Sequence, residues 1–178
     1  QSSETDGVWL VYNEVDPATT AESDTTYTSA GGGMVGRSVV YVVKSTDDGA
    51  SWSDPLKVDN AGGVGHQFFP DIDALGGGIA VVWQDSRFGP RSSIALSRSG
   101  DGGLTWSSPI KVNQTPAADP GEPAGNNQAF LPMVQVLNDG TVAVSYYDFR
   151  NNTSDSGATT PTDAFVVHCH ASCASAGS

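Results

Sequence analysis

Basic residues are scarce in this sequence. Eight Lys and Arg residues face twenty Asp and Glu residues, which gives a formal net charge of −12. A surface this acidic repels nucleic acid and anionic lipid, so we expect neither as a partner. The acids would keep an exported protein soluble or hold divalent cations. We expect no cofactor, and Ca²⁺ is the metal that such oxygen-rich chemistry would suit.

Long apolar segments are also missing. No run of about 18 apolar residues occurs, so we expect no membrane insertion. Glycine (21 residues) and proline (10 residues) are frequent. Both disfavour helix interiors, so we expect many short strands joined by turns. The chain opens at Gln1 without a charged, apolar leader, as it would after removal of a signal peptide or excision from a longer chain. A secreted, extracellular or cell-surface protein is expected.

Cysteines are few and close together. The chain has two, Cys169 and Cys173, with His168 and His170 beside the first. In an exported protein such cysteines pair with each other or with cysteines elsewhere. Four metal-type ligands in six residues also suggest zinc. However, successive strand residues point to opposite faces, which separates Cys169 from both histidines. We predict a disulfide, with two free thiols and a zinc site as the alternatives.

The chain contains an internal repeat. Residues 45–52 read Ser-Thr-Asp-Asp-Gly-Ala-Ser-Trp and residues 99–106 read Ser-Gly-Asp-Gly-Gly-Leu-Thr-Trp. Both follow the pattern Ser-x-Asp-x-Gly-x-Ser/Thr-Trp. An alternating strand precedes each copy, and Ser-x-Pro and a second short strand follow it. Each copy therefore predicts a strand, a tight turn and a strand.

The residue types in this pattern suit a turn. The Asp side chain accepts hydrogen bonds from nearby backbone amides, and the Ser hydroxyl adds local backbone bonds. The Gly adopts positive φ at little cost, and the Trp folds beneath the turn and buries its ring. We assign this structural role to Ser45, Asp47, Gly49, Trp52, Ser99, Asp101, Gly103 and Trp106.

A second repeat extends the unit. Residues 79–87 (Ile-Ala-Val-Val-Trp-Gln-Asp-Ser-Arg) resemble residues 142–150 (Val-Ala-Val-Ser-Tyr-Tyr-Asp-Phe-Arg), with a weaker copy at 9–14. We predict four-strand units, the first without its opening strand and the third without its last. Together they form one partial domain over 1–178, with units at about 8–60, 66–114 and 127–173. The insertions are expected to be loops, at 16–36, 115–127 and 151–162.

These motifs resemble a known family. The Ser-x-Asp-x-Gly-x-Thr-Trp string is similar to the Asp-box, or BNR repeat, of bacterial sialidases and related β-propellers. The resemblance covers nearly the whole chain and implies an all-β fold of four-stranded antiparallel blades. It implies six blades in the full parent, of which this chain supplies about three. The family's Asp-box lies between the third and fourth strands, away from the catalytic face.

The resemblance carries less information about activity. Sialidases of this family use three arginines, a Tyr-Glu pair and an Asp acid/base, and the first arginine sits in a Phe-Arg-Ile-Pro string. Here the comparable strings are Phe-Phe-Pro at 68–70 and Phe-Leu-Pro at 130–132, without arginine. This departure puts sialidase chemistry in doubt for this segment. An enzyme built on it would be a glycoside hydrolase of sialidase type.

Several polar residues are candidates for a site. Arg87 and Arg150 each follow an aspartate by two residues and suit a carboxylate ligand, or else an Asp–Arg pair that joins neighbouring blades. Tyr147 is a weak candidate for a ligand residue or nucleophile, whereas its neighbour Tyr146 is expected in the core. Asp71 and Asp73 share a strand face, and His66 lies just ahead of them; the cluster suits ligand contact, acid/base work or Ca²⁺.

Two function classes remain open from the sequence. The first is a non-catalytic propeller module that binds a glycan, binds a cell surface or has a structural role. The second is a piece of an extracellular sialidase-type exo-glycosidase whose remaining catalytic residues lie outside 1–178. For closure of the wheel we expect the missing blades, a second copy or a larger assembly as partners.

Overall fold

The computed structural model describes residues 7–19, 23–29, 32–59, 65–88, 91–116, 128–151 and 162–170. These ranges contain twelve strands and one short 3₁₀ helix. The strands are β1 (Val8–Val15), β2 (Ser23–Ser29), β3 (Gly32–Val35), β4 (Ser38–Ser45), β5 (Leu56–Lys57), β6 (Gln67–Leu75), β7 (Gly78–Asp85), β8 (Ser93–Ser99), β9 (Ile110–Lys111), β10 (Ala129–Val136), β11 (Val142–Asp148) and β12 (Asp163–Cys169), and the helix is η1 (Pro17–Thr19).

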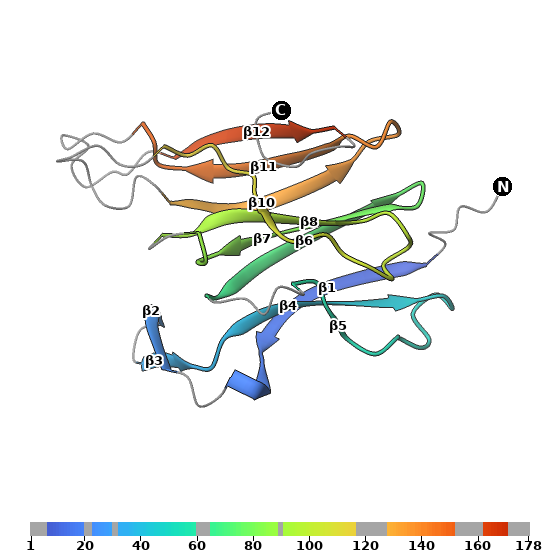
Figure 1. The fold of residues 1–178 in the computed structure, drawn as a ribbon, viewed down its shortest axis with the longest axis horizontal. Coiled ribbons are helices and arrows are strands. Elements are labelled where there is room, and N and C mark those ends of the chain that lie inside the picture. Colours follow the sequence, from blue (N-terminus) through green and yellow to red (C-terminus); the bar gives the residue numbers. More distant parts are fainter. Residues whose placement is uncertain are drawn as a thin grey trace.

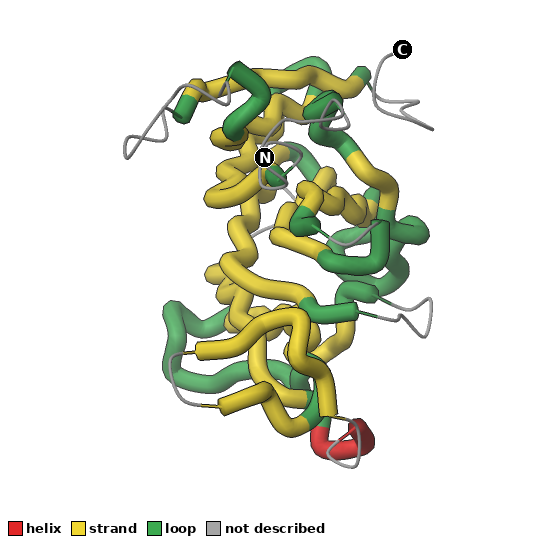
Figure 2. The backbone as a smooth tube through the Cα atoms, turned by 90° about the vertical axis from the view of Figure 1, so that its left-hand side faces the viewer, coloured by secondary structure: helices red, strands yellow, loops and turns green. Residues whose placement is uncertain are grey.

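Ten of the strands form three stacked antiparallel sheets, and β2 and β3 form a separate two-stranded sheet (Figure 1). Sheet one has the order β1-β4-β5, sheet two the order β6-β7-β8-β9 and sheet three the order β10-β11-β12. Sheet two lies in the middle: β6 contacts β1 and β4 on one side and β10 on the other. Figure 2 shows the same stack after a quarter turn, with η1 next to sheet one.

Two apolar layers hold the stack together. One lies between sheets one and two and includes Val40, Val81 and Trp83. The other lies between sheets two and three and includes Leu96 and Tyr146. Strand β7 is buried along almost its whole length because both of its faces are covered. Alternate residues of β7 face opposite sides, so this one strand stabilises both interfaces. Each fully buried Val, Ile or Leu side chain contributes about 1.5–3 kcal/mol relative to an exposed one.

The repeated box forms the same turn in sheets one and two. In the second copy, the Asp101 carboxylate accepts hydrogen bonds from the Thr105 amide (2.9 Å), the Thr105 hydroxyl (2.5 Å) and the Ser99 hydroxyl (2.8 Å). The Gly103 amide donates to the Ser99 hydroxyl at 2.8 Å. Gly103 has φ +87° and Gly49, its counterpart in the first copy, has φ +89°. The turn therefore closes on its own side chains.

The two box tryptophans differ, and one expectation was wrong. Trp106 is 8% exposed, but Trp52 is 42% exposed. The second turn packs against Trp9 of sheet one, whose ring lies directly over Gly103. Among the described residues no sheet covers the outer side of sheet one, so Trp52 has no comparable surface to fold onto. Burial of this tryptophan depends on the neighbouring sheet as well as on the turn.

The insertion at 16–36 also differs from the expectation. We expected a loop, but this segment contains η1 and a two-stranded antiparallel hairpin, β2–β3. Strand β4 then begins at Ser38 and pairs in register with β1, with Val15 opposite Ser38 and Val8 opposite Ser45. Most of the other insertions, at 117–127 and 152–161, lies outside the described residues.

Candidate functional site

The two ends of the stack differ in character. At one end lie the tight turns, namely the two boxes and the β6–β7 and β10–β11 connections. At the other end β6 and β10 begin and β7 and β11 finish. We call this second end the aromatic end and define it by Phe68, Phe69, Phe130, Leu131, Tyr147 and Phe149. Arg87, Arg150 and His66 also lie at this end because antiparallel pairing places them beside the same strand termini.

Strands β6 and β10 each have one residue near their start with an unusual backbone conformation. Phe69 has φ +51° and Leu131 has φ +50°, in the left-handed region that residues with a Cβ rarely adopt. The register shifts between Phe68 and Asp71 in β6 and at the equivalent place in β10. Each left-handed residue precedes a proline, which has no N–H to give to the ladder, so these pairs step out of the sheet as a bulge.

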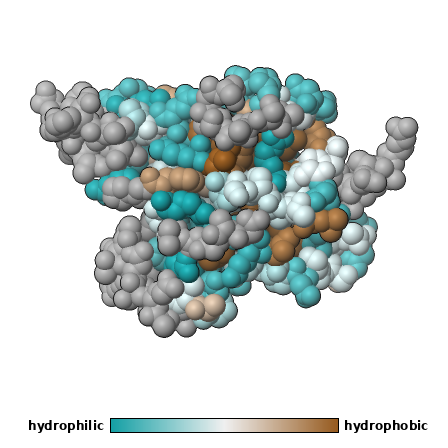
Figure 3. All heavy atoms as spheres, in the orientation of Figure 1, coloured by the Kyte–Doolittle hydropathy of each residue, from teal (hydrophilic) through white to brown (hydrophobic). Residues whose placement is uncertain are grey.

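The bulges display apolar side chains to solvent. Phe69 is 59% exposed, Leu131 51% and Tyr147 39%. Half-buried rings support them: Phe68 lies 6.2 Å from Phe69 between ring centroids, and Phe130 lies 6.1 Å from Tyr147. Figure 3 views the stack from the side, as Figure 1 does, and shows hydrophobic patches among hydrophilic residues on that side.

Gln84 links the two groups of rings. Its main chain lies opposite Phe68 in the β6–β7 ladder. Its side-chain oxygen accepts a hydrogen bond from the Leu131 amide at 3.3 Å, and its side-chain nitrogen donates to the Ser92 hydroxyl. Gln84 is buried, so it fixes the Leu131 bulge of sheet three against the end of β7 in sheet two.

Arg87 lies in a buried ion-pair network between sheets one and two. Its guanidinium contacts Asp85 at the end of β7 (2.7 Å) and Asp59, which follows β5. Burial alone would lower the pKa of Arg87, but the hydrogen bonds with Asp59 and Asp85 outweigh burial and raise it. Trp83 and Gln67 also donate to these carboxylates, at 2.6 Å each. Arg87 therefore joins two sheets.

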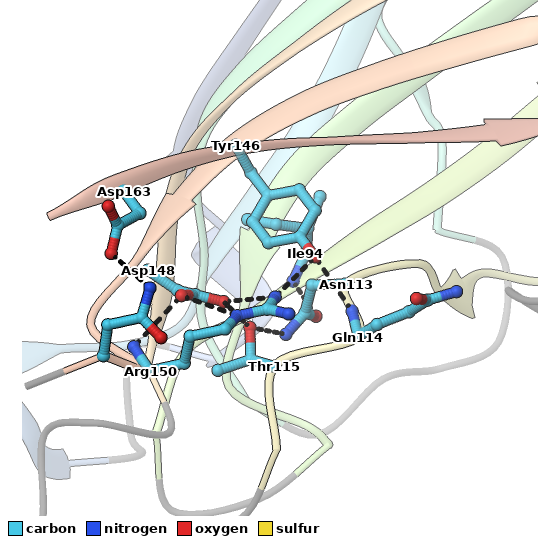
Figure 4. A network of polar contacts seen from close by, with 9 residues as sticks. Ile94, Asn113, Gln114, Thr115, Tyr146, Asp148, Arg150 and Asp163 are labelled. Atoms are coloured by element: carbon cyan, nitrogen blue, oxygen red, sulfur yellow. Dashed lines mark hydrogen bonds and ion pairs between the residues drawn. The ribbon is translucent and has the colours of Figure 1, made fainter.

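Arg150 occupies the equivalent place between sheets two and three (Figure 4). Its guanidinium donates to Asp148 at 2.6 Å and to the Tyr146 hydroxyl at 3.1 Å, and it stacks on Phe165 with 3.6 Å from Cζ to the ring centroid. The hydrogen bond with Asp148 raises the pKa of Arg150. Thr115, from the segment after β9, donates to the same carboxylate at 2.6 Å.

Sequence reasoning missed the partners contributed by the preceding sheet. Asp59 and Asn113 both follow the short last strand of a unit, one residue after Val58 and Val112. Their position in the repeat was the available signal. Asn113 accepts from the Ile94 amide at 2.8 Å and donates to Thr115 at 2.9 Å. Both residues continue a polar connection from one sheet to the next.

The acidic pair and His66 face different neighbours. Asp71 accepts from the Val134 amide at 2.8 Å and Asp73 from the Val136 amide at 2.7 Å, both on β10 of sheet three. His66 is buried, and its Nδ1 accepts from the Ser38 amide of sheet one at 3.2 Å. The predicted cluster thus divides between two interfaces. A groove of about 510 Å³ runs beside the two acids, over Met133 and Gln135 of β10 and on to β11 and β12 of the same sheet.

The tyrosine pair and the cysteines have distinct surroundings. Tyr146 is 1% exposed and accepts from the Gln114 amide, whereas Tyr147 points to the exposed face. Cys169 is buried and disulfide-bonded, and Cys173 lies outside the described residues. Within the described ranges, no group of three or more His, Cys, Asp and Glu side chains is arranged to hold a metal ion. No helix in those ranges is long and apolar enough to cross a membrane.

Comparisons with known proteins identify the fold. No protein-family model and no curated protein sequence matches the chain. A protein of unknown function from Dyadobacter fermentans matches at TM-score 0.59 and 14% identity, over 96% of this chain and 36% of that one. The Hadza microbial sialidase Hz136 matches at 0.56 and 17%, over 94% and 33%. A Penicillium chrysogenum α-L-arabinanase, solved with arabinobiose, matches at 0.53 and 14%, over 91% and 40%.

The chain spans about a third to two fifths of these structures. At such low identities the likeness establishes architecture, and it confirms the all-β propeller fold that the family resemblance implied. The number of blades in the whole wheel, the unit boundaries and the specific assignment to Asp-box repeats stay predictions. The chain has three antiparallel sheets of a propeller fold that sialidases and arabinanases also use.

Proposed function

We propose that this chain is part of a carbohydrate-binding propeller and that the aromatic end is its binding face. The observation that carries the proposal is the pair of left-handed, half-exposed apolar residues, Phe69 and Leu131, at equivalent places in adjacent sheets. Such conformations cost of order 1–3 kcal/mol each and persist where surrounding structure imposes them, often at ligand sites. The bulges hold the two apolar side chains in solvent at equivalent places, and we take this repeated exposure as the sign of a ligand site.

A sugar matches the chemistry of this face. One side of a pyranose or furanose ring presents C–H groups, which pack against exposed rings such as Phe69 and Tyr147. Its hydroxyls need donors and acceptors at the edge of that contact. The Tyr147 hydroxyl and the exposed side chains of Gln114 and Arg91 supply them at the same end of the stack. A mixed surface of this kind suits a neutral or weakly acidic glycan.

The polar candidates support binding without catalysis. The guanidinium groups of Arg87 and Arg150 are engaged with buried aspartates, and Asp71 and Asp73 accept main-chain hydrogen bonds. A substrate carboxylate would have to compete with an existing ion pair to reach either arginine. The disulfide at Cys169 and the acidic composition support an extracellular setting, where disulfides persist.

A second function is favoured by the structural neighbours. They include a sialidase, an arabinanase and the α-L-arabinofuranosidase Arb93A of Fusarium graminearum, which matches at TM-score 0.54 and 12% identity over 91% of this chain and 41% of that one. In this alternative the segment is one part of a glycoside hydrolase, and the aromatic end is a substrate subsite. The catalytic groups would then lie outside residues 1–178.

The test is a substitution that separates the ring from the backbone strain. Phe69→Asn removes the aromatic side chain while keeping a residue that tolerates the left-handed conformation. We expect unchanged or higher thermal stability together with at least a tenfold weaker affinity for sialyllactose or arabino-oligosaccharides by calorimetry. Leu104→Ala is the matched control, because Leu104 is 80% exposed in the box turn at the opposite end.

Two outcomes would count against the proposal. Unchanged oligosaccharide affinity in Phe69→Asn, or equal losses in Phe69→Asn and Leu104→Ala, would remove the aromatic end as the binding face. Hydrolysis of a fluorogenic sialoside or arabinoside by the chain, lost in Arg150→Ala, would place catalytic groups within residues 1–178 and contradict the proposal of a binding module.

A further inference from the structure

A second site is suggested by two histidines that the carbohydrate face does not use. His168 lies on β12, opposite Ala143 near the start of β11, and His170 directly follows the strand. Both side chains are exposed. They lie at the end of sheet three that carries the β10–β11 turn, away from the aromatic end. Residues two apart on a strand point to the same side, so the two rings emerge together.

The spacing of the rings suits a shared ligand atom. Their centroids are 5.2 Å apart and their planes meet at 76°. Two imidazoles that bind one metal ion at N–metal distances of about 2.0–2.1 Å in a tetrahedral arrangement have centroids about 5 Å apart. The observed pair therefore has the separation that joint coordination requires, before any metal is added.

Two neighbouring polar residues, Thr141 and Asp139, determine the tautomer of the His170 ring. Nδ1 of His170 lies 3.1 Å from the Thr141 hydroxyl. Hydrogen bonds from the Thr141 amide and then from its hydroxyl lower the pKa of Asp139. Because the hydroxyl gives its one proton to Asp139, it accepts from Nδ1–H of His170. This tautomer leaves the lone pair of Nε2 available, as in metal sites where an outer partner orients the ligating histidine.

The other nearby groups restrict what this pair can bind. Cys169 is buried and already disulfide-bonded, so it offers no thiolate. Arg98 donates to the carbonyl oxygens of His170 and Gly140, at 3.4 and 3.2 Å, which fixes the main chain on both sides of the pair. Two imidazole nitrogens with water in the remaining positions suit Cu²⁺, Ni²⁺ or Zn²⁺, whereas Ca²⁺ and Mg²⁺ prefer oxygen ligands. The net charge of −12 favours cations near the surface.

We infer that His168 and His170 form a two-histidine site for a divalent transition-metal ion, with Thr141 and Asp139 as the outer groups that orient His170. The zinc alternative raised by the sequence counted both cysteines and both histidines as ligands. The site inferred here keeps only the two histidines, because Cys169 is buried and disulfide-bonded. This metal site lies away from the carbohydrate face, so evidence against one of the two proposals does not bear on the other.

The experiment is a titration of the untagged chain with Cu²⁺ and Zn²⁺, followed by calorimetry and by electron paramagnetic resonance of the Cu²⁺ form. We expect one ion per chain, with hyperfine coupling from two imidazole nitrogens. His168→Ala and His170→Ala should each weaken binding more than tenfold and reduce the coupling to one nitrogen. Thr141→Val, which removes the hydroxyl at nearly constant volume, should weaken binding about tenfold through the outer contact alone.

The controls separate this site from attraction to an acidic surface. Asp54→Asn removes a charge from an exposed turn of sheet one and should leave binding unchanged. Equal affinity in the parent chain and both histidine variants would overturn the inference, as would Cu²⁺ spectra without nitrogen coupling or binding of Ca²⁺ as tight as that of Zn²⁺. All three alanine or valine variants bind oligosaccharide normally if the carbohydrate proposal holds, which keeps the two tests distinct.

Discussion

The carboxylate of Asp73 accepts a hydrogen bond from the main-chain amide of Val136 in the neighbouring sheet, at 2.7 Å. Strand β10 is the edge of its sheet in the order β10-β11-β12, so its outward amides have no strand partner within that sheet. Asp71 does the same for Val134. Two side chains thus take the place of a pairing strand and protect an edge that would otherwise be open to association.

Loss of these carboxylates should lower the unfolding free energy of the stack and leave oligosaccharide binding unchanged. For Asp73→Ala we expect about 1.5–3 kcal/mol of lost unfolding free energy, because a hydrogen bond to a charged group disappears and a partly buried amide is left unpaired. Urea denaturation measures this. Glu14→Ala, at an exposed position of β1, is the control and should change little. A similar small effect for both would mean that water replaces Asp73 at no cost.

Removal of the Arg87 guanidinium should have a larger effect. In Arg87→Met the apolar stem remains, while Asp85 (0% exposed) and Asp59 (6% exposed) lose their cation. Breaking a buried pair from one side typically costs about 3–5 kcal/mol. Arg91→Met is the comparison, since Arg91 is exposed in the same connection. Equal stability of the two variants in urea would show that the network contributes nothing to folding.

The box turns predict a particular response to acid. Hydrogen bonds from the Thr105 hydroxyl, the Thr105 amide and the Ser99 hydroxyl lower the pKa of Asp101 from its usual range to about 2. Because the folded pKa lies below the unfolded one, the stabilisation is complete above the unfolded value and is lost as pH falls toward the folded value. The melting-temperature gap between the parent chain and Asp101→Asn should be constant from about pH 7 to 5 and close near pH 2. Asp54→Asn should show no such trend.

The two box glycines allow a direct separation of strain from packing. Gly49 and Gly103 have nearly the same φ, but a Cβ on Gly49 meets only the Trp52 ring at 3.8 Å, whereas one on Gly103 collides with Trp9. Gly49→Ala should cost about 1–2 kcal/mol from the left-handed backbone. Gly103→Ala should cost about 1–3 kcal/mol more from the overlap. Equal losses in thermal unfolding would mean that Trp9 moves away freely.

The outer faces of the stack predict association. Apolar side chains that are 42–70% exposed occur on sheets one and three, namely Val8, Leu10, Leu56, Met133 and Val166. Exposed patches of this kind are uncommon on monomers. We expect the missing blades, a second copy or a larger assembly to cover them. Light scattering at micromolar concentration should show self-association of the isolated chain, and a monodisperse monomer that binds no hydrophobic dye would contradict this.

Sequence patterns predicted what depends on local chemistry. Alternation at 79–85 placed a strand, and Asp and Gly at fixed positions placed the box turns, because a turn of this type closes with its own side chains. The left-handed bulges were missed because Phe-Phe-Pro and Phe-Leu-Pro contain no residue that favours positive φ. The hairpin at 23–35 was missed because its Ser, Thr and Gly residues lack apolar alternation. The link between Arg87 and Asp59 spans 28 residues and exists only after the sheets pack.

The network around Arg87 also bears on the order of folding. Its two aspartates come from different sheets. If the interface between the sheets packed without this network in place, a charged group would be buried without its partner, which is costly. In a partly folded chain with sheet two formed and sheet one detached, Arg87 and Asp85 would be exposed to water. The attraction between Arg87 and Asp59 would then be lost. Adjacent sheets should consequently gain and lose protection against hydrogen exchange together, as one cooperative unit that includes β4, β5 and β7. The charges that join the two sheets in the folded chain thereby disfavour intermediates in which only one of the sheets is formed.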